Sequence, residues 1–322
     1  MSDASGIAAV LDHADIGPVG SIRERIGHPG STCRVHDVIA GDRRMVAKVA
    51  DRADLHERAT RELHVLRAIG DRLRGLAPRL IAGETDERSH RCIIVLEAVE
   101  GTPGDSLRGE EKDRIDSILD RMAIAWRIRA GDPDLEPLKL PDWGRGTTTC
   151  RPHHRRATRF IRRSRRMRER FPQLAAQHDH LAETIGDRFE TIASVPDDLP
   201  SRLIHGDLHL DNVVFSESGP RVLDWQTASI GDPVDDVVRL TLESGPDHTI
   251  DSLLEICERR PETRTTPARL ARSVLLAYAG LVSGLAGRPE LEPGSREHRF
   301  AARMLSPGWM AIPTREALDI LR

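Results

Sequence analysis

The sequence has no long apolar stretch and few cysteines. No hydrophobic run approaches the roughly 18 residues that a helix needs to span a bilayer, so no membrane-spanning helix is expected. The four cysteines, Cys33, Cys92, Cys150 and Cys257, lie far apart and form no Cys-x-x-Cys motif. This spacing gives no sign of a zinc site and is typical of reduced thiols, which predicts a cytoplasmic protein.

Aromatic residues are also rare, and no sign of charge dominates. Five Phe, four Trp and one Tyr argue against an aromatic cage for a quaternary ammonium group. A net charge of -3 gives no global indication of nucleic-acid binding. The Met-Ser-Asp-Ala start lacks the basic and apolar regions of a signal peptide. With 39% hydrophobic and 31% charged residues in 322, the composition predicts a globular chain with one large domain or two lobes.

One short stretch concentrates polar residues in a catalytic pattern. From 203 the chain reads Leu-Ile-His-Gly-Asp-Leu-His-Leu-Asp-Asn, followed by a hydrophobic hairpin and then Val-Leu-Asp-Trp. Its notable polar positions are His205, Asp207, Asn212 and Asp224. An Asp, an Asn five residues later and a second Asp after a strand-turn-strand form the layout of a kinase catalytic loop. In that layout the first Asp takes a proton from the attacking hydroxyl, and the other two residues hold magnesium.

The same stretch resembles a second class of enzyme. Residues 206–209 (Gly-Asp-Leu-His) and 231–235 (Gly-Asp-Pro-Val-Asp) are similar to the first two metal-binding motifs of calcineurin-like phosphoesterases. A two-metal hydrolase needs several ligands around paired ions. The third motif, Gly-Asn-His followed by an acid, does not occur downstream, where only His248 and His298 follow residue 240. A metal-dependent phosphoesterase is therefore the weaker alternative.

A lysine inside a strand favours the kinase. Residues 43–50, Arg-Arg-Met-Val-Ala-Lys-Val-Ala, predict a short apolar strand around Lys48, close to the Val-Ala-Ile-Lys signature. The chain has only three lysines against 45 arginines. A lysine here indicates that a compact ammonium is needed, because a planar guanidinium fits differently between phosphates and a carboxylate.

The segment that follows predicts a helix with a carboxylate for that lysine. Apolar residues spaced by three and four predict an amphipathic helix over 54–74. They are Leu55, Ala59, Leu63, Leu66, Ile69 and Leu73. Glu62 lies at the margin of the apolar face and is the expected partner of Lys48, whereas Glu57 lies off that face and is the weaker choice.

Two further segments suit a nucleotide. Gly27, Gly30, Ser31 and Thr32 precede a strand predicted over 34–40, and offer donors to phosphate oxygens. A buried strand predicted over 92–96 leads into Glu-Ala-Val-Glu-Gly. There, free N–H and C=O groups of Leu96 and Ala98 are expected to contact the edge of a purine.

These parts, in this order, resemble the aminoglycoside phosphotransferase family. This kinase-like group also includes choline, fructosamine and macrolide kinases. The resemblance covers roughly residues 25–240 and is most specific at 203–236. Within it, residues 231–236, Gly-Asp-Pro-Val-Asp-Asp, are similar to the family's Gly-Asp-Pro-x-x-Asp motif.

The resemblance implies a role for each of these positions. Asp207 is the catalytic base, and Asn212 and Asp224 bind Mg²⁺. Lys48, paired with Glu62, holds the α and β phosphates of ATP or GTP. The other implied nucleotide-binding residues are Ser31, Thr32, Leu96, Glu97 and Ala98, and the implied structural supports of the catalytic loop are His205 and Asp236.

The resemblance also implies an α+β, bilobal, protein-kinase-like fold. A nucleotide-binding lobe over 1–97 is expected to contain a small antiparallel sheet and one main helix. After a hinge at about 96–101, a mostly helical catalytic and acceptor-binding lobe is expected over 98–322. Helical spacing predicts helices around 115–126, 267–287 and 295–305 in that lobe. Short strands around the catalytic loop are expected to form its sheet.

The predicted reaction is transfer of the γ-phosphate of ATP or GTP to a hydroxyl of a sugar-, nucleoside- or antibiotic-like acceptor, in antibiotic resistance or metabolism. Trp225-Gln226 replaces the Phe-Gly of protein kinases, which favours a small-molecule kinase. Residues 151–170 hold ten arginines and one acid, a charge run usually found on a solvated face. If that run lined the acceptor site, it would disfavour polycationic aminoglycosides. A nucleotide-binding pseudokinase remains an alternative.

Overall fold

The computed structural model describes residues 2–25, 33–106, 111–141, 201–244, 248–287 and 311–321, together with 184, 185, 187, 188, 191, 192 and 195. The chain forms two compact units, each built from separate segments. The first contains Met1–Arg108, Gly131–Leu140 and Asp211–Ala228. The second contains Gly109–Ala130, Pro141–Leu210 and Ser229–Arg322.

The first unit contains a five-stranded antiparallel sheet in the order β1-β2-β3-β5-β4. Its strands are β1 (Val19–Glu24), β2 (Arg34–Ala40), β3 (Arg43–Ala50), β4 (Leu80–Asp86) and β5 (Arg91–Glu97). The strands predicted over 34–40 and 43–50 are confirmed, and β5 contains the predicted strand 92–96. Gly41, with φ +60°, lies in the turn between β2 and β3, in a left-handed conformation that glycine adopts without strain.

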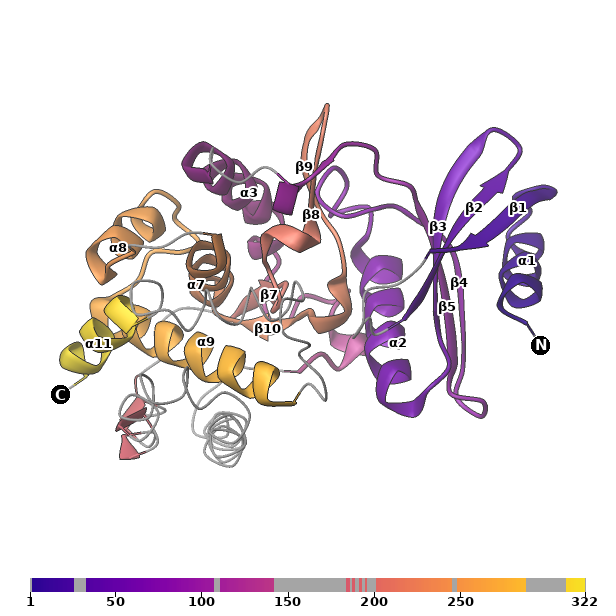
Figure 1. Ribbon diagram of the computed structural model, residues 1–322. Helices are drawn as coiled ribbons and strands as arrows, with labels where there is room; N and C mark the ends of the chain where they lie inside the picture. Colours follow the sequence, from indigo (N-terminus) through magenta and orange to yellow (C-terminus); the bar gives the residue numbers. More distant parts are fainter. Residues whose placement is uncertain are drawn as a thin grey trace. The chain divides into compact units, whose positions relative to one another are not determined.

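Two helices cover opposite faces of this sheet (Figure 1). The main helix, α2 (Ala53–Ile69), is shorter than the predicted 54–74, because Gly70 ends it and the chain then turns. Leu73 continues the helical spacing and is fully buried, but it lies beyond the last helical turn. A second helix, α1 (Asp3–His13), was not predicted from the sequence.

Packing on these two faces decides the direction of the Lys48 side chain. Ile7, Val10 and Leu11 of α1 form a core cluster with sheet residues that include Ala47 and Val49. Successive side chains of a strand point to opposite faces, so residue 48 points to the face that α2 covers. The alternation of β3 therefore directs the lysine toward the helix that carries Glu62.

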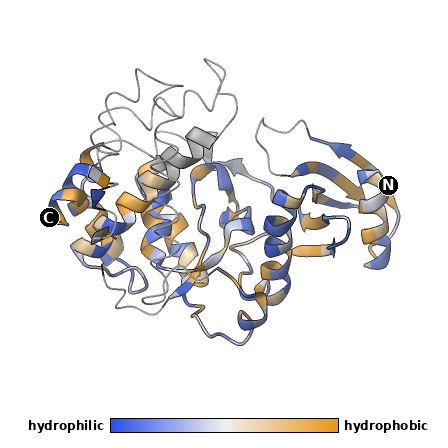
Figure 2. Cartoon of the chain, turned by 90° about the horizontal axis from the view of Figure 1, so that it is seen from below, coloured by the Kyte–Doolittle hydropathy of each residue, from blue (hydrophilic) through white to orange (hydrophobic). Residues whose placement is uncertain are grey.

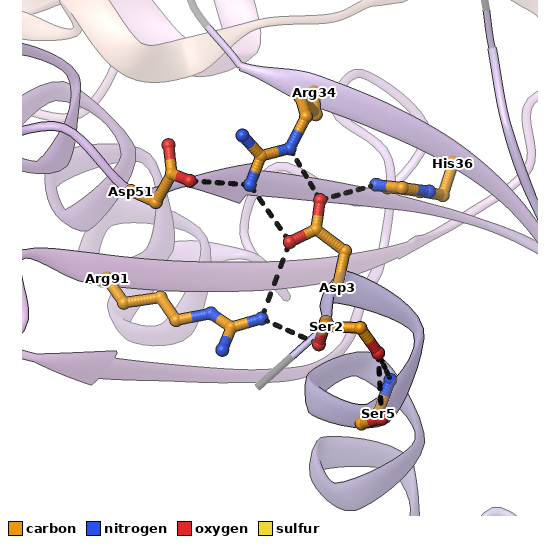
Figure 3. A network of polar contacts seen from close by, with 7 residues as sticks. All are labelled: Ser2, Asp3, Ser5, Arg34, His36, Asp51 and Arg91. Atoms are coloured by element: carbon orange, nitrogen blue, oxygen red, sulfur yellow. Dashed lines mark hydrogen bonds and ion pairs between the residues drawn. The ribbon is translucent and has the colours of Figure 1, made fainter.

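A polar network anchors the start of α1 to the sheet (Figure 3). Asp3 accepts hydrogen bonds from Arg34 Nε at 2.5 Å and Arg34 Nη2 at 2.9 Å, and contacts His36 Nε2 at 3.1 Å. Arg91 Nη2 lies 3.5 Å from the same carboxylate and donates to the Ser2 carbonyl at 3.2 Å. The hydrogen bond from Arg34 lowers the pKa of Asp3 below its ordinary value, against the opposing effect of burial.

The first unit also contains a three-stranded sheet, β6-β8-β9. Its strands are β6 (Thr102–Pro103), β8 (Val213–Ser216) and β9 (Gly219–Val222). Gly101, with φ +152°, precedes β6, and a Cβ there would lie 2.2 Å from the Phe215 carbonyl oxygen. Only glycine therefore lets the chain run this close to β8.

The second unit is mostly helical. Its described helices are α3 (Glu111–Trp126), α7 (Pro233–Ser244), α8 (Ile250–Glu258), α9 (Pro267–Gly287) and α11 (Ala311–Ile320). Helices predicted around 115–126 and 267–287 are confirmed, whereas the predicted helix 295–305 lies outside the described residues. A short antiparallel pair, β7 (Arg202–Ile204) and β10 (Ser229–Gly231), leads into and away from the predicted catalytic segment.

A buried ion cluster ties α7 to α9. Asp232, directly before α7, contacts Arg269 Nε at 2.5 Å and Arg272 Nη2 at 3.5 Å, and all three side chains are buried. The other oxygen of Asp232 accepts the Val234 N–H at 3.0 Å, which caps the first turn of α7. The Gly-Asp-Pro motif thus fixes where α7 begins.

Hydrophobic and hydrophilic residues are mixed along the helices that Figure 2 colours. In the part of the chain that the structure describes, no helix combines the length and apolarity needed to cross a membrane.

The anchor of α1 can be tested with Asp3→Asn. The variant should lose about 1–3 kcal/mol of unfolding free energy at pH 7, because hydrogen bonds to a charged group are lost. Since the pKa of Asp3 is lowered in the folded chain, its contribution is complete above the unfolded pKa and disappears as the pH falls through the folded pKa. The difference from wild type in urea denaturation should therefore shrink below about pH 4.

Asp12→Asn is the matched control, because it removes the same charge from an exposed position of the same helix. It should change stability by a few tenths of a kcal/mol at most. Equal losses in both variants would show that net charge, and not the Asp3 contacts, stabilises α1.

Candidate active site

The first unit brings three charged residues from three segments together. Lys48 Nζ donates to both oxygens of Glu62 at 2.8 Å and to Asp224 Oδ1 at 2.9 Å. β3 supplies the lysine and α2 the glutamate, while Asp224 follows β9. The side chains of Lys48 and Glu62 are only 15% and 2% exposed. An ammonium has three donors, and here all three acceptor oxygens are carboxylate oxygens.

Burial and pairing act in opposite directions on this cluster. Burial alone would lower the pKa of Lys48, but the carboxylates of Asp224 and Glu62 outweigh it and raise that pKa well above its ordinary value. Burial raises the pKa of Glu62, while the Lys48 ammonium opposes the rise. Lys48 is therefore a fixed cation at neutral pH, held between two acids.

Asp224 has an unusual backbone and a second side-chain contact. Its φ of 65° places a non-glycine residue in the left-handed region, which costs roughly 1–2 kcal/mol. Its Oδ2 accepts a hydrogen bond from Gln226 Nε2 at 2.8 Å. The neighbouring Trp225 is buried, and its backbone N–H donates to Glu62 at 3.3 Å. These contacts hold the Asp224 carboxylate in one orientation.

The β8–β9 hairpin brings Asn212 and Asp224 to the same end. Val213 pairs with Val222, and the Leu223 N–H donates to the Asn212 carbonyl at 2.7 Å. Asn212 and Asp224 therefore flank one hairpin although 11 residues separate them. Their amide and carboxylate oxygens are hard ligands that suit Mg²⁺, which usually takes one or two carboxylates plus phosphates and water. Among the described residues, no group of three or more His, Cys, Asp or Glu could hold a metal ion by itself.

Several polar groups at the predicted hinge already have partners within the chain. The Ala98 N–H, expected to be free for a purine, donates to the Arg44 carbonyl at 3.2 Å. That part of the prediction is wrong, because the chain extends its pairing with the first residues of β3 beyond Glu97. Glu97 forms an ion pair with Arg221 and accepts the Arg79 N–H at 3.0 Å. Leu96 is buried in β5.

The second unit contains the first part of the predicted catalytic loop, residues 205–210, whose backbone is bonded to a buried carboxylate. Asp236 of α7 accepts the N–H of His205 and the N–H of Gly206, both at 2.9 Å. Trp126 Nε1 of α3 donates to the same carboxylate at 3.1 Å. Burial raises the pKa of Asp236, against the lowering effect of His205 and these donors. His205 is fully buried, and its Nδ1 accepts the Asp207 N–H at 3.3 Å.

Asp207 itself is partly exposed and lies beside an arginine. Its Oδ1 is 2.6 Å from Arg239 Nη2, and its Oδ2 is 3.8 Å from His209 Nε2. Arg239 belongs to α7, as Asp236 does. Neither Arg239 nor Gln226 was identified from the sequence. Gln226 was noted only for replacing a glycine, and Arg239 carries no motif of its own.

Some predicted positions lie outside the described residues. These are Ser31 and Thr32 of the phosphate loop, and the arginine-rich segment 151–170.

Comparison with known proteins gives a consistent family assignment. Residues 28–292 match the family model described as "Phosphotransferase enzyme family" (APH). No curated protein matches the chain by sequence.

Several solved structures share the fold at low sequence identity. A choline/ethanolamine kinase family protein from Mesorhizobium loti is 16% identical with a TM-score of 0.62, over 99% of this chain and 97% of that chain. The GDP complex of wild-type aminoglycoside 2′-phosphotransferase-IIIa is 15% identical with a TM-score of 0.61, over 95% and 97%. A choline kinase from Streptococcus pneumoniae is 17% identical with a TM-score of 0.57, over 94% and 99%. These similarities confirm the predicted kinase-like α+β fold.

The pairing of Lys48 with Glu62 and Asp224 can be tested by its effect on stability. Glu62→Gln should cost about 1–3 kcal/mol of unfolding free energy, because it leaves a buried ammonium with one carboxylate partner fewer. Adding Lys48→Met should recover part of that loss, since the uncompensated charge is then gone. Urea denaturation of the two single variants and the double variant measures the coupling.

Glu57→Gln is the control, because Glu57 lies on the same helix with its side chain 81% exposed. It should change stability by less than about 0.5 kcal/mol. Additive effects of Glu62→Gln and Lys48→Met would contradict the pairing.

Proposed function

Because this chain belongs to the phosphotransferase enzyme family, we propose that it is a kinase that transfers the γ-phosphate of ATP or GTP to a hydroxyl group of a small molecule. The observation that carries this proposal is the ion cluster in which Lys48 Nζ lies 2.8 Å from Glu62 and 2.9 Å from Asp224. A strand lysine that pairs with a helix glutamate and with the aspartate after the catalytic loop is the arrangement that kinases use for nucleotide phosphates.

The proposed nucleotide lobe comprises residues 1–97. Lys48, held by Glu62, would contact the α and β phosphates, and Ser31 and Thr32 would donate to phosphate oxygens. Leu96, Glu97 and Ala98 would border the adenine or guanine at a hinge over 96–101. Because the Ala98 N–H is already bonded to Arg44, purine contacts at this residue would involve its carbonyl group.

Asn212 and Asp224 are the residues that would hold Mg²⁺. When bound, the ion neutralises negative charge on the transferring phosphate. Asp224 is already oriented before an ion binds, because Lys48 and Gln226 each donate a hydrogen bond to one oxygen of its carboxylate. A side chain that is oriented in advance loses less conformational entropy when it binds the ion.

Asp207, in the proposed catalytic and acceptor-binding lobe 98–322, would act as the base. As the acceptor oxygen forms its bond to the γ-phosphorus, the hydroxyl proton passes to Asp207 and the bond to the leaving ADP or GDP breaks. Asp236 and His205 fix the backbone on both sides of Gly206, so the position of Asp207 is set by buried groups.

We propose a sugar-, nucleoside- or antibiotic-like acceptor without strong positive charge, in antibiotic resistance or in metabolism. The scarcity of aromatic residues argues against a quaternary ammonium acceptor, although one structural relative is a choline kinase. ADP release, measured with a panel of hydroxylated small molecules, tests the proposal directly. Acceptor-dependent release is expected. Nucleotide binding without release would indicate a pseudokinase, and phosphate-ester hydrolysis without nucleotide would indicate a phosphoesterase.

Removing the proposed base gives a first test of the chemistry. Asp207→Asn should lower kcat by about 10²-fold or more, because a general base typically contributes 10²–10⁴-fold. Nucleotide affinity should change little. Asp211→Asn removes the same charge from an exposed position four residues later and should keep most of the activity. If Asp207→Asn keeps more than about a tenth of wild-type turnover, the base is misassigned.

The proposed metal ligands give a second test. Asp224→Ala should abolish turnover and weaken Mg²⁺-dependent nucleotide binding, because a charged oxygen ligand is lost. Asn212→Ala should have the same effect to a smaller degree, because a neutral ligand is lost. Titration calorimetry of nucleotide with and without Mg²⁺ measures both effects. Unchanged magnesium dependence in Asp224→Ala would exclude that residue as a ligand.

A further inference from the structure

Helix α7 contacts the catalytic loop at two positions on one face. Asp236 accepts the backbone N–H groups of His205 and Gly206. Arg239 follows Asp236 by three residues, so both project from the same side of the helix. The Arg239 guanidinium reaches Asp207 Oδ1 at 2.6 Å. The loop is therefore held through its backbone at 205–206 and through the side chain of its acid at 207.

From this contact we infer that Arg239 positions the Asp207 carboxylate and makes the acceptor site favour hydroxyl compounds without positive charge. The inference rests on the proposed function, because it assigns Asp207 as the base. It adds a residue outside every motif described above and a physical cause for acceptor choice.

The positioning role of Arg239 follows from the rotational freedom of the aspartate carboxylate. Rotation about the Cβ–Cγ bond of aspartate has broad minima, so an unheld carboxylate samples many orientations. A charge-assisted bond from Arg239 to Oδ1 restricts that rotation. The ion pair with Arg239 therefore holds the Asp207 carboxylate in one orientation, with Oδ2 3.8 Å from His209 Nε2.

The charge preference follows from the same pair. The negative charge of Asp207 is compensated by Arg239, so a cationic acceptor gains little from approaching the base. Both side chains are about a quarter exposed, at 26% and 27%, so neither is fully screened by water. Like charges brought together at a binding site disfavour the wrong partner.

Two variants and one control separate these effects. Arg239→Gln removes the charge and the fork of donors, and Arg239→Lys keeps the charge but loses the planar geometry. Arg264→Gln removes the same charge from an exposed position of the second unit. Steady-state ADP release is measured with three forms of one sugar, namely glucose, glucosamine and glucuronate, and the fold of each variant is checked by thermal denaturation.

Arg239→Gln is expected to lower kcat about 10- to 100-fold for the acceptor that wild type uses best, because a misplaced base loses rate. KM for the nucleotide should stay unchanged. The ratio of kcat/KM for glucosamine to kcat/KM for glucose should rise roughly tenfold, as expected for one unit charge near the acceptor. Arg239→Lys should recover part of kcat and keep the wild-type preference. Arg264→Gln should behave as wild type.

The failure of this inference differs from the failure of the proposed function. If wild type releases ADP with none of the sugars, the proposed function and this inference both fail for this acceptor class. If wild type is active but Arg239→Gln keeps kcat and the charge preference, only the inference is overturned. A rise in kcat in Arg239→Gln would also overturn it, because Arg239 would then restrain the base. Equal effects of Arg264→Gln would assign the preference to net charge.

Discussion

A carboxylate removed from water must be compensated by donors or cations, and this constraint organises both units. Desolvating a charge is expensive, so each buried acid here has partners from distant segments. Glu62 has Lys48, Asp236 has the N–H groups of the catalytic loop, and Asp232 has Arg269 and Arg272. Each of these contacts joins at least two elements. Within each unit, the same interactions that satisfy buried charge therefore also fix the positions of candidate functional residues.

The compensation differs in kind between the two units. Lys48 balances its two acids with a single compact ammonium. Asp236 is balanced by His205 and by backbone and indole N–H groups, which orient the loop. The first cluster thus contains a buried cation, whereas the second restrains the backbone of the loop. The left-handed backbone of Asp224 adds a local cost that the contacts with Lys48 and Gln226 offset.

The parts of this arrangement that depend on local pattern could be predicted from the sequence. The short apolar run in 43–50 and its similarity to the Val-Ala-Ile-Lys signature predicted the strand of Lys48, and helical spacing predicted the helix that carries Glu62 at the margin of its apolar face. The fold followed from the motif order, which the family match confirms. The helix was predicted too long because Leu73 keeps the apolar spacing, while Gly70 ends the hydrogen-bonded helix. The short α1 was missed because its few buried residues, Ile7, Val10 and Leu11, give a weak signal. Arg239 and Gln226 were missed because a side-chain contact made through tertiary structure leaves no local pattern, and the assigned roles of all these residues remain predictions.

The first unit is discontinuous in sequence, and this has a consequence for its synthesis. Lys48 and Glu62 leave the ribosome long before residue 224, so the lysine lacks one of its two acidic partners for more than 150 residues of elongation. The strands β8 and β9 also arrive late, although they belong to the first unit. This unit therefore cannot complete its folding as an independent N-terminal domain, which is the usual order for multidomain chains. A nascent chain that ends before β8 would leave Lys48 without Asp224 and the β6-β8-β9 sheet incomplete.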